Sequence, residues 1–192
     1  MVRQQSANDF SSPIYIGPFL LGMVKLCYHI IGSLIMVENK HRLINLPEPI
    51  IIAANHNSSF ETSLLAHFLM QYRNGKKVSF LTDWMYQHAP INDWLMNQLD
   101  PIFVYNKPST ISFINRFRKS SDPKYACNKC IRYLQNNLSI VILPEGTRNR
   151  NPNRLKVGRR GIGEIILQTS ISVLPSGTNF PVRIEHGKIP KF

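Results

Sequence analysis

A chain of 192 residues with 43% hydrophobic content is long enough for one domain with its own core, which excludes a string of small modules or a disordered tail. Its 23 Lys and Arg residues outnumber the 11 acidic residues and give a formal net charge of +12, so the expected partners are anionic: nucleic acid, anionic lipid or phosphorylated substrates. Three cysteines are too few for a disulfide framework and favour a reducing compartment.

The N-terminal part contains one long apolar segment, from Ile14 to Val37, which is interrupted by Lys25 and His29. It is long enough to span a bilayer, but a Lys near the middle of a span is costly, so an oblique or interfacial helix fits equally well. No small-x-small cleavage site follows, which argues against a cleaved signal peptide. We therefore expect a tail over residues 1–13, an apolar membrane-associating helix over 14–38 and a folded domain over 39–192, with a buried soluble helix as the alternative for 14–38.

The rest of the chain alternates short β-type runs with helix-length amphipathic stretches. Strands are predicted at 50–54, 78–81, 102–105, 140–143, 172–174 and 182–185. Helices are predicted at 59–72, 91–99, 124–137 and 161–168. This alternation predicts an α/β fold with a mixed central sheet flanked by helices.

The first candidate site lies where the strand at 50–54 ends and the next helix begins, which is where α/β folds place their sites. His56 lies in the turn, and Glu61 follows it in the first turn of the helix. A neutral imidazole can accept the proton of a hydroxyl that attacks a thioester carbonyl, and a carboxylate on the other ring nitrogen fixes its tautomer. His56 is therefore a candidate general base and Glu61 the candidate group that orients it.

Both residues also have a purely structural interpretation. Ser58 and Glu61 fit the Ser-x-x-Glu capping box, in which Ser caps the helix and Glu bonds back to the cap. His56 alone could be an ordinary hydrogen-bonded histidine. This motif by itself leaves catalysis and capping both open.

The second candidate site is Pro144–Arg148, directly after the apolar run at 140–143 and therefore at the same edge of the sheet. Gly146 allows a sharp turn or a close approach to a ligand, and Arg148 offers a planar fork for phosphate oxygens. Glu145 could accept a hydrogen bond from a substrate hydroxyl or hold Arg148 in position. Without a second motif, this segment would be interpreted as a solvated turn.

Together, the two motifs resemble those of the glycerophospholipid acyltransferases of the 1-acylglycerol-3-phosphate acyltransferase type. The first block of that family reads N-H-x-S-x-x-D, and the third reads F-P-E-G-T-R. The matching residues here are Asn55, His56, Ser58 and Glu61 for the first block, and Leu143, Pro144, Glu145, Gly146, Thr147 and Arg148 for the third. The similarity runs from residue 50 to residue 176, and the family's N-terminal apolar helices suit the segment at 14–37.

The resemblance implies a membrane-associated O-acyltransferase of phospholipid biosynthesis. Acyl-CoA or acyl-carrier protein would donate the fatty acyl group to lysophosphatidic acid or a related lysolipid, with no cofactor and no metal. His56 with Glu61 would be catalytic, without a covalent acyl-enzyme. Substrate binding would fall to Glu145, Gly146, Thr147, Arg148 and Ser58.

Two positions depart from the family pattern. Glu61 stands where the family usually has Asp, which changes its reach toward His56. The family's second block, G-x-x-F-I-x-R, ends here in Asn106 instead of Arg, and Lys107 is the candidate replacement. Because Lys lacks the bidentate geometry of Arg, a non-phosphate lipid acceptor and a catalytically weakened lipid-binding relative are the alternatives.

The remaining signals concern partners and location. The basic residues from Arg148 to Arg160 are either a solvated face or a surface for lipid head groups and the phosphates of CoA. Nucleic acid is not an expected partner because no RNA- or DNA-binding motif is present. Cys127 and Cys130 are expected to be ordinary helix residues, since a zinc site needs two more ligands. The protein is expected at a membrane, with its folded domain on the cytoplasmic face.

Overall fold

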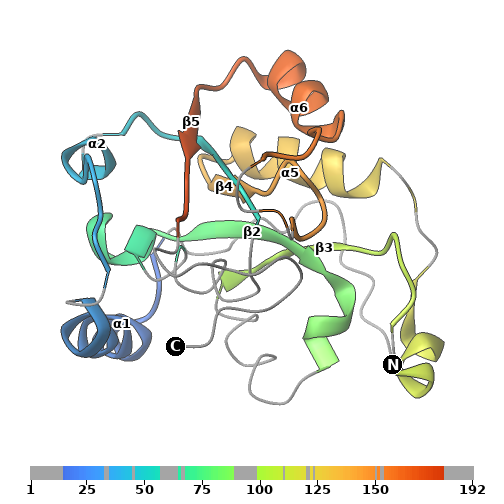
Figure 1. Ribbon diagram of the computed structural model, residues 1–192, viewed down its shortest axis with the longest axis horizontal. Helices are drawn as coiled ribbons and strands as arrows, with labels where there is room; N and C mark the ends of the chain where they lie inside the picture. Colours follow the sequence, from blue (N-terminus) through green and yellow to red (C-terminus); the bar gives the residue numbers. More distant parts are fainter. Residues whose placement is uncertain are drawn as a thin grey trace.

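The computed structural model describes residues 15–32, 35–44, 46–56, 65, 68–88, 99–109, 111–119, 122, 124–149, 151 and 154–179. In chain order its elements are α1 (Pro18–Ile31), α2 (His41–Ile44), β1 (Ile51–Ala54), β2 (Val78–Asp83), the 3-10 helix η2 (Trp84–His88), β3 (Ile102–Val104), the 3-10 helix η3 (Ser112–Phe117), α5 (Tyr125–Gln135), β4 (Ser139–Ile142), α6 (Gly161–Thr169) and β5 (Val173–Ser176). Figure 1 shows α5 and α6 on one side of the sheet and α1 on the other.

The described strands form one sheet in the order β3-β2-β4-β1-β5, and each pairing between neighbours is parallel. In the central pair, Ile51 of β1 lies beside Ile140 of β4. All four residues of β4 are buried, as expected for an apolar strand that is covered on both faces. Because the strands run in the same direction, their carboxyl ends meet at one edge of the sheet.

Each face of the sheet has its own core, because successive residues of a strand point to opposite faces. Ile52 packs on one face in a cluster with Leu20 of α1. Ile51 packs on the other face in a cluster with Leu134 of α5 and Ile165 of α6. Burial of each such aliphatic side chain stabilises the fold by about 1.5–3 kcal/mol, so both helix layers hold the sheet in place.

Most of the predicted elements are present in the described part of the chain. β1, β2, β3, β4 and β5 overlap the predicted strands, and α5 and α6 overlap two predicted helices. Of the helix predicted at 59–72, residues 65 and 68–72 are helical and the rest lie outside the described residues. Most of the helix predicted at 91–99 and the whole strand predicted at 182–185 also lie outside them. The prediction of a mixed sheet was wrong for the described strands, which pair only in parallel.

The helix α1 is shorter than the apolar segment predicted over 14–38, and it has apolar residues on two faces. One face buries Leu20 and Val24 in the core. The other face carries an exposed apolar stripe, which consists of Phe19 (71% exposed), Met23 (42%), Leu26 (60%) and Ile30 (62%). Within the described ranges, no helix has both the length and the apolarity that crossing a bilayer requires.

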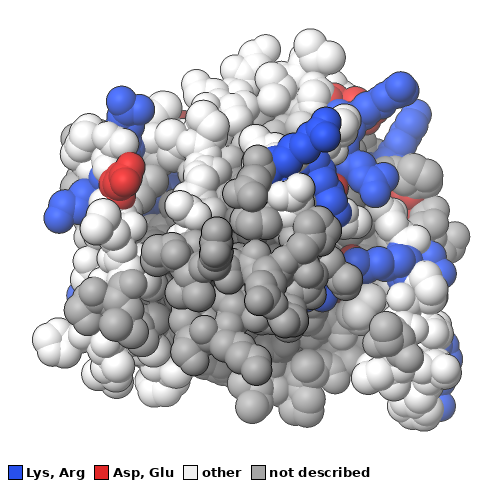
Figure 2. Space-filling view, in the orientation of Figure 1, with Lys and Arg blue, Asp and Glu red and all other residues white. Residues whose placement is uncertain are grey.

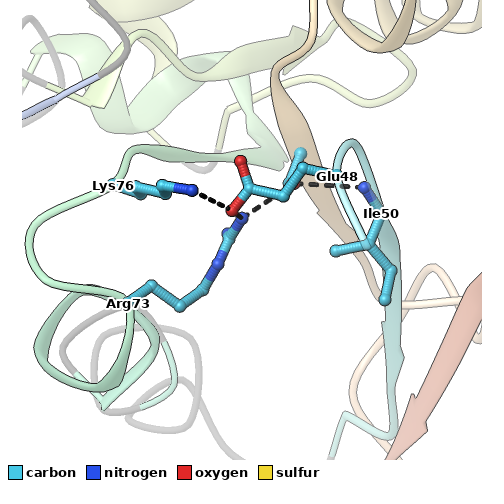
Figure 3. A network of polar contacts seen from close by, with 5 residues as sticks. Glu48, Ile50, Arg73 and Lys76 are labelled. Carbon is cyan, nitrogen blue, oxygen red and sulfur yellow. Dashed lines mark hydrogen bonds and ion pairs between the residues drawn. The ribbon is translucent and has the colours of Figure 1, made fainter. Parts of the chain in front are cut away.

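A buried ion pair ties the amino ends of the two central strands together (Figure 3). The Arg73 guanidinium donates to Glu48 Oε1 at 2.6 Å and to Ser139 Oγ at 3.0 Å, while the Ile50 amide donates to the same Ser139 oxygen at 3.1 Å. Lys76 Nζ lies 3.0 Å from Glu48 Oε1. Burial alone would raise the pKa of Glu48, but hydrogen bonds and charge from Lys76 and Arg73 outweigh it and lower this pKa below its usual 4.5.

Candidate active site

His56 and the Pro144–Arg148 segment follow adjacent parallel strands and so lie at the same edge of the sheet. His56 comes two residues after the end of β1, and Pro144 comes two residues after the end of β4. A hydrogen bond joins the two segments directly, because the Asn149 amide donates to the His56 carbonyl oxygen at 2.6 Å. The sheet therefore brings together two motifs that lie far apart in the sequence, and the Nδ1 atom of His56 is buried there.

The residue before His56 is held from the other side by the segment that follows β5. Asn55 Nδ2 donates to the Thr178 carbonyl at 3.0 Å. Asn55 Oδ1 accepts from the Thr178 amide at 2.7 Å and from its hydroxyl at 3.0 Å. The chain at Asn55 and His56 is thus fixed on one side by Asn149, which lies after β4, and on the other by Thr178, which lies after β5.

The Glu-Gly-Thr-Arg segment begins with a tight turn, in which the Gly146 amide donates to the Leu143 carbonyl at 2.9 Å. Gly146 has a φ of +62°, a left-handed conformation that favours glycine. A side chain here would also meet Arg159, whose Cγ lies 3.0 Å from the position that a Cβ would take. Arg159 in turn donates its backbone amide to the Pro144 carbonyl at 2.7 Å. The glycine is therefore required by both the turn and the overlying arginine.

Glu145 is the buried acid of this segment, with only 5% of its surface exposed. Neither of its carboxylate oxygens has a hydrogen-bond partner among the described residues. A buried carboxylate without donors is unfavourable by several kcal/mol, so a bound group that donates hydrogen bonds to it would be strongly favoured. The Glu145 carboxylate makes no hydrogen bond to Arg148, its neighbour in the described segment, whereas a role toward a substrate hydroxyl fits its burial.

Thr147 and Arg148 are exposed and lie beside a second cation. Lys156 Nζ donates to the Arg148 carbonyl at 2.7 Å and lies 3.4 Å from Thr147 Oγ1. The same loop borders a cavity of about 290 Å³, which is lined by Asn149, Asn151, Arg154, Leu155, Lys156 and Val157. Figure 2 shows one face of the molecule, on which Lys and Arg side chains gather over the half that includes α5. Few acidic atoms are visible there.

Lys107 lies apart from the predicted substrate-binding residues of the Pro144–Arg148 segment. It follows β3, which is separated from β4 by β2. Its ammonium group is paired with Asp83 Oδ2 at 2.9 Å, and its carbonyl accepts from Trp84 Nε1 at 2.9 Å. The sequence did not signal this pairing.

Ser58 and Glu61 lie outside the described residues, so both the catalytic pair with His56 and the capping box stay predictions. Three site residues were not anticipated in their observed roles: Thr178, Asn149 and Arg159. Asn149 directly follows the third block, which is the one signal that could have pointed to it. Arg159 belongs to the basic stretch from Arg148 to Arg160, but that pattern does not indicate its contact with the turn at Gly146. Thr178 has no signal in the sequence, because its partner Asn55 lies far away along the chain.

The two cysteines of α5 have no sign of reactivity. Cys127 and Cys130 are free thiols, and burial raises the pKa of Cys130 to about 12. In the part of the chain that the structure covers, no group of three His, Cys, Asp or Glu side chains is placed to hold a metal ion.

Comparison with known proteins relates this fold and these motifs to one family. A sequence model described as Acyltransferase matches residues 35–179. No curated protein matches the chain. Among solved structures, the chain is similar to the 1-acyl-sn-glycerophosphate (LPA) acyltransferase PlsC from Thermotoga maritima, with a TM-score of 0.58 and 19% identity over 82% of this chain. The match spans 56% of the Thermotoga chain. At this identity, the likeness is one of fold.

Proposed function

Because the chain belongs to the Acyltransferase family, we propose that it is a membrane-associated O-acyltransferase that moves a fatty acyl group from acyl-CoA or acyl-carrier protein to lysophosphatidic acid or a related lysolipid. The observation that carries this proposal is the 2.6 Å hydrogen bond from the backbone amide of Asn149 to the backbone carbonyl of His56. It holds the candidate base beside the Glu-Gly-Thr-Arg segment, as a reaction between two bound substrates requires.

In the proposed reaction, His56 accepts the proton of the acceptor hydroxyl while the hydroxyl oxygen bonds to the thioester carbon. The tetrahedral intermediate then collapses, the carbon–sulfur bond breaks, and the imidazolium returns the proton to the leaving thiolate. Glu61 would hold the imidazole in the required tautomer. No acyl group is bound to the enzyme at any stage.

The acceptor would be recognised by the segment after β4. A hydroxyl of the lysolipid would donate a hydrogen bond to the buried Glu145 carboxylate, which lacks a partner among the described residues. Its phosphate would lie against the exposed Arg148 and against Lys156, which lines the cavity and contacts the Arg148 carbonyl. Lys107, which is paired with Asp83 and follows β3, is not assigned a role toward this phosphate.

Membrane contact would be made by the exposed apolar stripe of α1. An interfacial helix lies in the plane of the membrane with one apolar face in the headgroup and acyl boundary. Here the opposite face of α1 is buried in the core, so the helix would attach the domain to one leaflet. The cytoplasmic leaflet is the proposed one, because its anionic lipids attract a basic protein.

Acyl transfer from radiolabelled palmitoyl-CoA and from palmitoyl-acyl-carrier protein to a panel of lysolipids tests the proposal. His56→Ala should lower turnover by at least about a hundredfold, the effect of losing a general base. His41→Ala, which changes an exposed histidine of α2, is the matched control and should keep wild-type turnover. Glu145→Gln should raise KM for the acceptor more than KM for the donor.

Two results would overturn the proposal. Equal turnover of His56→Ala and His41→Ala would remove His56 as the base. Absence of product with every donor and acceptor, in a wild-type protein that binds lysolipid, would favour a lipid-binding relative without catalysis.

A further inference from the structure

A second apolar surface lies on the loop that follows β3. Ile111, Phe113 and Phe117 are 58%, 61% and 47% exposed. Phe113 and Phe117 belong to η3 and contact each other edge to face, with ring centroids 6.1 Å apart. Two exposed aromatic rings and a β-branched side chain on one short loop form an apolar tip that no described part of the protein covers.

The loop presents this tip on a hydrogen-bonded frame. Asn115 Oδ1 accepts from the Ser109 amide at 2.6 Å, and Asn115 Nδ2 donates to the Ser109 carbonyl at 3.1 Å. At the end of η3, the Arg118 guanidinium donates to the Tyr105 carbonyl at 3.0 and 3.2 Å. Both ends of the loop are therefore tied to the chain, and the exposed rings are held away from the core.

The charge around the tip is entirely positive. The segment from Lys107 to Lys119 contains no Asp or Glu. The Arg116 guanidinium lies 3.5 Å from the centre of the Phe113 ring and 4.8 Å from that of Phe117, so it stays at the apolar tip instead of pairing with an acid. Apolar rings next to the exposed cations Arg116 and Lys119 match a surface that offers acyl chains below a layer of phosphates.

The position of η3 agrees with such a surface. Figure 1 draws α1 at the lower left and η3 at the lower right, whereas α5 and α6 lie at the top. The two elements that carry exposed apolar side chains, α1 and η3, thus both lie in the lower half of this view, away from α5 and α6. A flat surface could contact both, while a small protein docked at η3 alone would leave α1 uncovered.

We propose that the loop of η3 is a second membrane contact, which inserts Phe113 and Phe117 into the interface of an anionic bilayer and places Arg116 and Lys119 against lipid phosphates. The inference rests on the proposed membrane function and deepens it, because two separated contacts set the orientation of the sheet edge that carries His56. An acidic acyl-carrier protein is the other class of partner that a basic aromatic loop could accept.

The test measures binding to vesicles of phosphatidylcholine alone and to vesicles that also contain phosphatidylglycerol, without donor or acceptor. Phe113→Ser/Phe117→Ser should lower the partition coefficient on anionic vesicles by about tenfold. Arg116→Gln/Lys119→Gln should lower it by about the same factor on anionic vesicles and little on neutral ones. The matched control is Leu167→Ser on α6, which removes an apolar side chain that is 85% exposed and should leave binding unchanged.

A second measurement reports insertion directly. Tryptophan fluorescence of Phe113→Trp should be quenched by vesicles whose acyl chains carry bromine, beyond the quenching of wild type, and Leu167→Trp should show no added quenching. All variants change exposed residues, so unchanged melting temperatures should confirm that they are folded.

Equal quenching of Phe113→Trp and Leu167→Trp, or unchanged partitioning of the serine variant, would overturn the inference. A serine variant that binds vesicles normally but has a raised KM for acyl-carrier protein would assign the loop to that partner instead. The vesicle assay measures binding without turnover, so the two proposals can fail separately. A protein that transfers no acyl group but still binds vesicles through η3 would contradict the proposed catalysis and support this membrane contact.

Discussion

Asn55→Ala should both destabilise the protein and slow its turnover, because Asn55 connects the His56 backbone to the segment after β5. The substitution removes three hydrogen bonds to Thr178, at 3.0, 2.7 and 3.0 Å. Each such bond contributes about 0.5–1.5 kcal/mol, and water can replace part of the loss because both residues are only partly buried. We expect the free energy of unfolding to fall by about 2 kcal/mol, which lowers Tm by about 4–8 °C in a domain of this size.

The catalytic effect follows from the position of Asn55 directly before His56. A misplacement of a reacting group by about 1 Å can cost a hundredfold in rate. We therefore expect kcat to fall by about tenfold or more, with KM little changed, because the residues of the Glu-Gly-Thr-Arg segment stay in place. Urea unfolding followed by circular dichroism gives the stability, and acyl transfer at a temperature where the variant is folded gives the kinetics.

Thr178→Val is the matched control for this prediction. It removes only the hydrogen bond from the Thr178 hydroxyl to Asn55, and the backbone amide and carbonyl of Thr178 stay in place. The free energy of unfolding should therefore fall by less than about 1 kcal/mol, and turnover should stay near the wild-type value. If Asn55→Ala behaves like Thr178→Val in both assays, the reasoning that Asn55 positions His56 is refuted.

Three further predictions follow from the fold and the site. Arg73→Met leaves Glu48 paired with Lys76 alone, and should lower the free energy of unfolding in urea by about 1.5–3 kcal/mol. The pKa of Glu48 is lower in the folded protein than its usual value of 4.5, so the ion pair contributes its full stability above that pH. This stability is lost as the pH falls through the folded pKa. The Arg73→Met variant should therefore lose less stability in acid than the wild-type protein does. Gly146→Ala should cost about 1–2 kcal/mol because of its positive φ, whereas Gly22→Ala, with open space around it on α1, should raise Tm. Glu61→Gln should keep Tm while lowering turnover by about a hundredfold, and full activity of that folded variant would leave Glu61 as a helix cap only.

The secondary structure was largely readable from the sequence because it depends on local patterns. The strand β4 is buried at every residue and shares 140–142 with the predicted apolar run, as a strand covered on both faces does wherever it lies in the sheet. The short 3-10 helices η2 and η3 were not predicted, since five or six residues, at three residues per turn, are too few to show a period.

The candidate site was only partly readable. The order of residues around His56 and around Glu145 was enough to identify two motifs and to place both at strand ends. The bond from Asn149 to His56 and the bonds from Thr178 to Asn55 connect segments that are far apart along the chain. No local pattern encodes such pairs, because either partner alone is an ordinary polar residue.

An α/β domain, its family motifs and its positive charge can be read from the order of the amino acids, because composition and local periodicity depend on neighbouring residues. The position of β4 between β2 and β1, the parallel pairing of the described strands and the ion pair of Lys107 with Asp83 become visible only in the folded protein. The tertiary structure also decided which apolar residues of α1 and η3 remain exposed. Those outcomes depend on which surfaces the sheet and helices cover when they pack, and that is a property of the whole chain.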